Sequence, residues 1–157
     1  MLLPGILTVT IPILIKFGFG ELLFDMLESD IPVIKYENIT MPKLPDLTRF
    51  KDVTELLLMN VKLSSVHESV GKLDKLTILS LSGNKIEELP REIGMLRNLE
   101  VLNLKGNKIT TIPEDIRFLD KSNGGNLYRV SLNEGDLSKE NLAKLKKLLP
   151  EAVISGM

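Results

Sequence analysis

The sequence predicts an α/β solenoid, in which short repeat units stack along one axis. Residues 76–98, LTILSLSGNKIEELPREIGMLRN, and residues 99–121, LEVLNLKGNKITTIPEDIRFLDK, coincide at almost every apolar position, with a period of 23. Both carry an LxL alternation, which suits a strand that turns every second side chain into a core. Leucines at helical spacing follow near the C-terminus. A fixed period of this length indicates units that bury their apolar sides against their neighbours.

Composition bounds the possible functions. A chain of 157 residues has the size of one ordinary domain. Its 20 Lys and Arg side chains balance 21 Asp and Glu, so no bulk field draws it to nucleic acid, and we expect no nucleic-acid partner. The chain contains no Cys, which excludes disulfides, thiolate metal sites and cysteine nucleophiles.

Residues 1–20, MLLPGILTVTIPILIKFGFG, carry a single charged side chain, Lys16, and admit two interpretations. A helix of about 20 apolar residues could span a bilayer, which would make the chain a membrane-anchored protein. However, residues 7–15 alternate with period two, and Pro4 and Pro12 suit an edge strand better than a helix. Residues 21–30 follow as a short apolar helix. We therefore predict that residues 1–30 form an N-terminal cap, with the anchor as the alternative.

The repeats are predicted to cover residues 31–137, with units starting near 31, 53, 76, 99 and 127. Steps of 23 and 22 back from Leu76 reach Val53 and Ile31, where similar apolar patterns begin. In the forward direction, KSNGGN (121–126) is an insertion, after which the pattern resumes at Leu127. Five units are therefore expected.

An asparagine marks the turn of each central unit, at Asn84 and Asn107. Its side-chain amide can satisfy backbone groups in the turn. The corresponding positions of the outer units hold Ile39, Val61 and Gly135. We expect those turns to be held in another way and to be less regular.

The central units fit the pattern LxxLxLxxNxLxxLPxxIxxL, which resembles the leucine-rich repeat family in its subtype of 22 to 23 residues with LPxxI. The resemblance covers residues 31 to about 149. It implies a short right-handed superhelix with a parallel sheet on its concave side, and a protein-protein interaction module.

Residues 138–157 are predicted to form a C-terminal capping helix and tail. Ser138 is a suitable N-cap, and Pro150 ends the helical pattern. Leucines at 142, 145, 148 and 149 would face the last repeat unit.

The sequence offers little for catalysis. His67 is the only histidine, and it stands where the repeat usually has Pro. Neither a second metal ligand nor an orienting partner for general-base chemistry accompanies it in the sequence. We therefore expect no enzyme, no cofactor and no metal.

The remaining candidate site is the concave face, where side chains that point out of the strands commonly contact partners in the family. The predicted partner-binding residues are Val33, Lys35, Glu55, Leu57, Met59, Ile78, Ser80, Val101, Asn103, Tyr128 and Arg129. Five of them, Val33, Leu57, Met59, Ile78 and Val101, are expected to form a diagonal apolar stripe, which is typical of a protein interface. The alternative is that strands simply favour β-branched residues.

The sequence thus predicts a non-enzymatic module that binds a protein or peptide. We expect a cytoplasmic chain, with a membrane-anchored one as the alternative. The apolar N-terminal edge could also pair with a second copy to form a homodimer.

Overall fold

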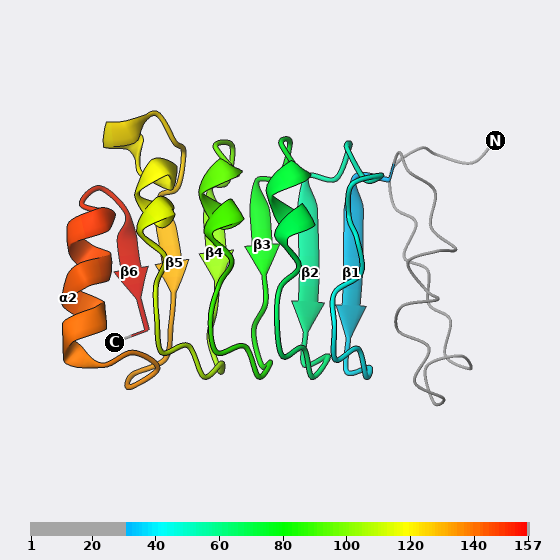
Figure 1. Cartoon of the computed structure of the whole chain (residues 1–157), viewed down its shortest axis with the longest axis horizontal. Coiled ribbons are helices and arrows are strands. Elements are labelled where there is room, and N and C mark those ends of the chain that lie inside the picture. Colours follow the sequence, from blue (N-terminus) through cyan, green and yellow to red (C-terminus); the bar gives the residue numbers. More distant parts are fainter. Residues whose placement is uncertain (1–30, 157) are drawn as a thin grey trace.

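The computed structural model describes residues 31–156, and within them six strands form one parallel sheet in chain order (Figure 1). The predicted fold class, an α/β solenoid with a parallel sheet, is confirmed. The cap predicted for residues 1–30 lies outside the described residues. The strands are β1 (Val33–Glu37), β2 (Glu55–Met59), β3 (Ile78–Ser80), β4 (Val101–Asn103), β5 (Arg129–Ser131) and β6 (Val153–Ser155).

The strand register follows the sequence period. Val33 lies opposite Glu55, Glu55 opposite Ile78, and Ile78 opposite Val101. The first five strands each begin two residues after a predicted unit start. Val101 pairs with Arg129, 28 residues later, so the KSNGGN insertion leaves the sheet register intact.

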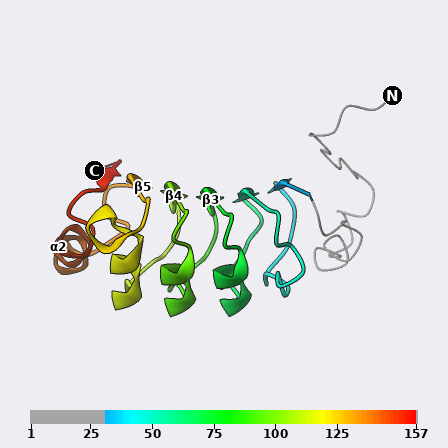
Figure 2. The same ribbon diagram turned by 90° about the horizontal axis from the view of Figure 1, so that it is seen from above.

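Short 3₁₀ helices lie on the side of the core opposite the strands (Figure 2). Their backbones pack closely, because a Cβ atom added to Gly94 would lie only 2.3 Å from the carbonyl oxygen of Asp115 in the next unit. A side chain at position 94 would therefore push two units apart. The helices are η2 (Glu68–Lys72), η3 (Arg91–Met95), η4 (Glu114–Leu119) and η5 (Lys121–Asn123).

One hydrophobic core runs between the sheet and the helices. Each unit contributes equivalent side chains, such as Leu56, Leu79 and Leu102, all 0% exposed. Burying a leucine side chain contributes about 1.5–3 kcal/mol. Because every layer touches only its neighbours, the units stabilise one another in sequence along the axis.

The turn asparagines hold adjacent units together. The Nδ2 atom of Asn84 donates to the carbonyl oxygens of Leu58 and Leu81, at 2.8 and 2.9 Å. Its Oδ1 atom accepts from the backbone N–H groups of Val61 and Leu63, at 3.1 and 3.0 Å. One side chain thus satisfies four buried backbone groups across two units, and Asn107 makes the equivalent bonds to Leu81, Leu104 and Ile86.

The turn that follows each strand needs a left-handed residue, and the outer units supply it differently. Gly83 and Gly106 take this conformation in the central units, with φ of 69° and 70°. Asn38 and Asn60 take it in the first two units, with φ of 56° and 55°. Asparagine tolerates this region better than most residues with a side chain. Lys62 also has φ of 62°, in the second unit, where Val61 replaces the turn asparagine, so the expectation of less regular outer turns is confirmed in that unit.

The C-terminal helix forms as the sequence predicts. α2 (Lys139–Leu148) begins after Ser138, whose Oγ atom accepts from the backbone N–H of Asn141 at 3.2 Å. Leu145 is 0% exposed against the last unit, and Lys144 pairs with Glu114 of η4 at 2.7 Å.

The residues after α2 differ from the tail that the sequence predicts, because they add a sixth strand. In β6, Val153 pairs with Arg129 and Ser155 with Ser131. Among residues 31–156, no helix is both long and apolar enough to span a membrane.

We predict that Asn84→Ala lowers the free energy of unfolding by about 2–4 kcal/mol, because it leaves four buried backbone groups without partners. Urea denaturation followed by circular dichroism measures this. Asn98→Ala is the matched control, since both of its side-chain hydrogen bonds are exposed. Asn98 donates to the carbonyl oxygen of Asp74 at 2.7 Å and accepts from the Nδ2 atom of Asn126 at 3.5 Å. A loss for Asn84→Ala no larger than that of the control would contradict the role assigned to the turn amide.

Candidate functional site

The candidate site is the outward face of the sheet, which we call the sheet face. In β2, Leu56 and Leu58 are 0% exposed in the core, whereas Glu55, Leu57 and Met59 alternate with them and are partly exposed. Side chains of a strand alternate between the two faces. The alternation therefore places these three residues on the sheet face.

The parallel register arranges the sheet face in rows across the strands. The first row is Val33, Glu55, Ile78, Val101, Arg129 and Val153. The second row is Lys35, Leu57, Ser80, Asn103, Ser131 and Ser155. Met59 lies one step further along β2, and Tyr128 immediately precedes β5. The structure thus brings the predicted partner-binding residues onto or beside one face.

Four partly exposed side chains form an apolar patch near the middle of the sheet face: Leu57, Met59, Ile78 and Val101. We call these four residues the apolar patch. Val33, which the sequence places in the same stripe, lies next to Glu55 in the first row and diagonally from Leu57, so it extends the apolar surface toward β1. The apolar patch itself lies on β2, β3 and β4.

Charged side chains flank the apolar patch. On the β1 side, Lys35 and Glu37 pair at 3.9 Å. On the β5 side, the guanidinium of Arg129 lies 5.6 Å from the ring centre of Tyr128, which is 40% exposed. This geometry is a cation–π contact on an exposed surface.

Ser80 is the least accessible of the predicted partner-binding residues. It is only 6% exposed, and its Oγ atom accepts from the Nδ2 atom of Asn103 at 3.3 Å. A partner would therefore meet the apolar patch and Asn103 before it met this hydroxyl.

Sequence reasoning missed Val153, which is 62% exposed at the end of the first row. The only signal was a short alternation in VIS at 153–155, which follows a proline and is too brief to predict a strand.

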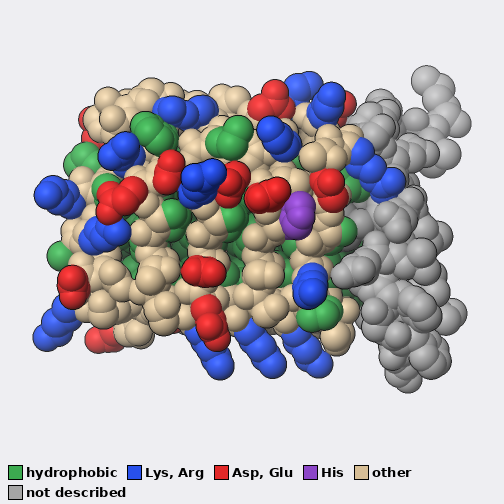
Figure 3. All heavy atoms as spheres, in the orientation of Figure 1, with side chains coloured by type: hydrophobic (Ala, Val, Ile, Leu, Met, Phe, Trp, Pro, Cys, Tyr) green, Lys and Arg blue, Asp and Glu red, His purple; other side chains and the backbone are tan. Residues whose placement is uncertain are grey.

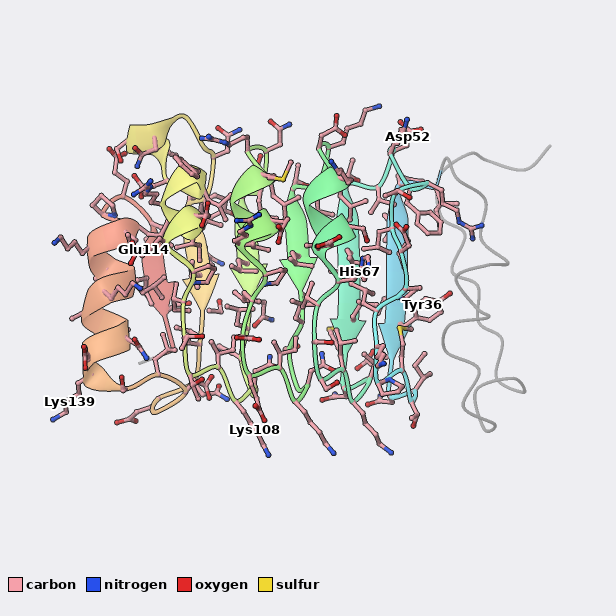
Figure 4. The ribbon with its side chains drawn as sticks, viewed as in Figure 1. Tyr36, Asp52, His67, Lys108, Glu114 and Lys139 are labelled. Carbon is pink, nitrogen blue, oxygen red and sulfur yellow. The ribbon has the colours of Figure 1, made fainter. Side chains whose placement is uncertain are left out.

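His67 acts as a helix cap. Its Nδ1 atom accepts from the backbone N–H of Ser69 at 3.1 Å and lies 2.8 Å from the Oγ atom of Ser69. That hydroxyl also accepts from the backbone N–H of Leu47, and Ser69 is only 4% exposed. Both groups are thus committed to the start of η2, on the helix side of the molecule where charges of both signs are mixed (Figures 3 and 4).

Metal ligands do not gather in the described residues, where His, Cys, Asp and Glu side chains form no group of three that could hold an ion. The buried carboxylate there, Asp120, has another role. Its Oδ1 atom accepts from the backbone N–H and the hydroxyl of Ser122, at 2.9 and 2.6 Å. Its Oδ2 atom accepts from the backbone N–H of Glu151 at 3.0 Å. Asp120 therefore ties the insertion to the segment that leads into β6.

The hydrogen bonds to Asp120 decide its charge. Burial alone would raise the pKa of its carboxyl group, but the bonds from Ser122, Glu151 and Ala152 outweigh burial and hold the pKa below the ordinary value. The ionised form is therefore the one that stabilises the fold.

Stacked units of strand, turn and 3₁₀ helix, joined by turn amides, define a solenoid repeat protein with an open parallel sheet. The chain belongs to the leucine-rich repeat family, because the family model described as a leucine-rich repeat region matches residues 31–148. The family is generally one of interaction modules rather than enzymes. The finer subtype of 22 to 23 residues stays a prediction.

Solved structures support the same assignment. A leucine-rich repeat protein of Leptospira interrogans is 32% identical, with a TM-score of 0.75, over 81% of this chain and 31% of that one. A plant ice-binding protein is 24% identical, with a TM-score of 0.54, over 69% and 34%, and this likeness shows the fold alone. The plant peptide hormone receptor RGFR1 in complex with RGF2 is 25% identical, with a TM-score of 0.52, over 82% and 25%.

The chain spans about a third or less of the length of these solved proteins. No curated protein matches it.

We predict that Asp120→Asn lowers the free energy of unfolding by about 2 kcal/mol at pH 7. An amide has only one oxygen to accept the hydrogen bonds that the two carboxylate oxygens accept in the wild type. Since the folded pKa of Asp120 is depressed, its contribution is complete above the ordinary value of 3.8 and is lost as the pH falls through the folded pKa. Urea denaturation of both proteins at pH 7 and at successively lower pH measures the difference.

The comparison isolates Asp120, because every other carboxylate titrates in both proteins. The difference between the two proteins should shrink below about pH 4. A difference that stays constant down to pH 2.5 would contradict the stabilising role of the ionised form.

Proposed function

We propose that the sheet face binds a protein or peptide, and that the apolar patch supplies most of the binding energy. The observation that carries this proposal is the contiguity of Leu57, Met59, Ile78 and Val101 on three neighbouring strands. Partly exposed apolar side chains that adjoin one another, with polar and charged residues around them, are typical of interaction sites.

Strand propensity alone does not account for the apolar patch. Ile78 and Val101 are β-branched, so strand preference explains them on an exposed face. Leu57 and Met59 are not β-branched, and they occupy alternate outward positions of one strand. An unbranched, adaptable methionine is common at binding surfaces that accept varied side chains.

The scaffold beneath the patch favours binding, because it is already ordered. Leu56, Leu58, Leu79 and Leu102 are buried directly behind it, and the sheet is continuous across the three strands. A preformed surface loses less conformational entropy when a partner docks. One solved structure similar to the chain is a plant peptide hormone receptor, which agrees with a peptide or protein as the partner class.

Four other expectations from the sequence analysis stay predictions. They are the absence of enzymatic activity, the cytoplasmic location, the homodimer through the N-terminal edge, and the alternative in which residues 1–20 anchor the repeats in a membrane. The proposal for the sheet face holds for either location, since it depends only on the repeats.

We predict that Leu57→Glu combined with Ile78→Glu abolishes partner capture, because two carboxylates would have to be buried at the interface. Immobilised wild-type and variant chains are exposed to a lysate of the source organism, and captured proteins are identified by mass spectrometry. Both substituted side chains point away from the core, so circular dichroism and the melting temperature should change little.

Met95→Glu is the matched control, since Met95 is a 50% exposed apolar side chain on the helix side. Partners of the sheet face should be captured by the wild type and the control but not by the double variant. Equal capture by all three chains would disprove the proposal.

A further inference from the structure

The first row of the sheet face contains charged residues beside two residues of the apolar patch. Across β2, β3, β4 and β5 it presents Glu55, Ile78, Val101 and Arg129 in direct register. These four residues, which we call the polar row, place an acid at one end, two apolar side chains in the middle and a base at the other end.

The two end charges do not neutralise each other. Parallel strands lie about 4.8 Å apart, so three spacings separate Glu55 from Arg129 by about 14 Å. That exceeds the Debye length of about 8 Å at physiological ionic strength.

Neither charge takes part in an ion pair among the described residues. The ion pairs among residues 31–156 are Lys35–Glu37, Lys75–Asp52, Arg91–Glu92 and Lys144–Glu114, and none includes Glu55 or Arg129. The guanidinium of Arg129 instead lies beside the ring of Tyr128, which orients it without cancelling its charge. Val101 and Val153 flank Arg129 in the row.

We infer that the partner is an extended segment with opposite charges four residues apart and an apolar side chain between them, an inference that rests on the proposed function. An extended chain rises about 3.3 Å per residue, so residues i and i+4 are about 13 Å apart and their side chains point to the same face as that of residue i+2. This spacing matches the distance between Glu55 and Arg129. The base of the segment meets Glu55, its acid meets Arg129, and residue i+2 packs on Ile78 and Val101.

The inference specifies that the base of the segment meets Glu55 and its acid meets Arg129. It does not specify the direction in which the segment runs. A segment with Lys or Arg at i and Asp or Glu at i+4 fits in one direction, and the reversed pattern fits in the other. Segments with two acids or two bases oppose one end of the row in either direction. The sheet face is therefore selective for a segment with opposite charges at these two positions. The net charge of the segment does not produce this selectivity.

A library of random nine-residue peptides displayed on phage tests this inference. It is panned in parallel on the wild-type chain, on Arg129→Glu, on Glu55→Lys, and on the double variant Leu57→Glu with Ile78→Glu. Lys72→Glu is the control for charge reversal, because Lys72 is exposed on η2, on the helix side. Selected peptides are then synthesised, and their dissociation constants are measured by fluorescence polarisation at two salt concentrations.

Peptides selected on the wild type and on Lys72→Glu should carry opposite charges at i and i+4 around an apolar i+2. Arg129→Glu should select bases at both positions, and Glu55→Lys should select acids at both. A wild-type peptide should bind Arg129→Glu roughly tenfold more weakly, since one exposed attraction becomes a repulsion. This loss should diminish at high salt.

Two other outcomes would distinguish a failure of the inference from a failure of the proposed function. If peptides are enriched on the wild type relative to the double variant, but show no charge pattern or the same pattern on Arg129→Glu, the inference is wrong and the proposed function stands. If no peptide is enriched relative to the double variant, the sheet face does not bind peptides, and both the proposed function for peptide partners and the inference fall.

Discussion

The structure depends on one kind of interaction, the side-chain amide that joins the turn of one unit to the turn of the unit before it. Asn84 donates to carbonyl oxygens of both units and accepts two N–H groups of the earlier one. The buried backbone at these turns would otherwise lack partners, because a turn cannot satisfy itself as a helix does. The amide therefore fixes the spacing and rotation of each unit relative to the last.

Fixed spacing turns a linear repeat into rows of side chains. Because every strand starts at the same point of its unit, residues one period apart become direct neighbours across the sheet. The 28-residue step from Val101 to Arg129 keeps the same register, since the five additional residues lie outside the sheet and Asp120 holds them from within. The row of Glu55, Ile78, Val101 and Arg129 thus depends on both the turn amides and this carboxylate.

Sequence reasoning predicted the features that the repeat itself encodes. The starts of five strands, the role of Asn84 and Asn107, and the cap at Ser138 all follow from local patterns repeated at a known period. β6 was missed because it has only three residues, which are too few to show a period, and because it follows soon after Pro150. Asp120 was missed because its partner at Glu151 lies 31 residues away.

The candidate binding surface extends from the regular central units of the solenoid to the less regular second unit. The apolar patch and the polar row lie on β2 to β5. Asn84 and Asn107 anchor the turns of the two central units, where Gly83 and Gly106 supply the left-handed positions. The second unit departs most from this regularity, since Asn60 and Lys62 both adopt left-handed backbone there. A side chain in that region costs of order 1 kcal/mol. Asn60 offsets part of the cost by packing over Gly83, where any Cβ atom would lie 1.8 Å from its Oδ1 atom. Glycine at position 83 is therefore required twice, for its own turn and for the one before it. This contact helps hold Glu55 in register with Ile78, and Leu57 in register with Ser80.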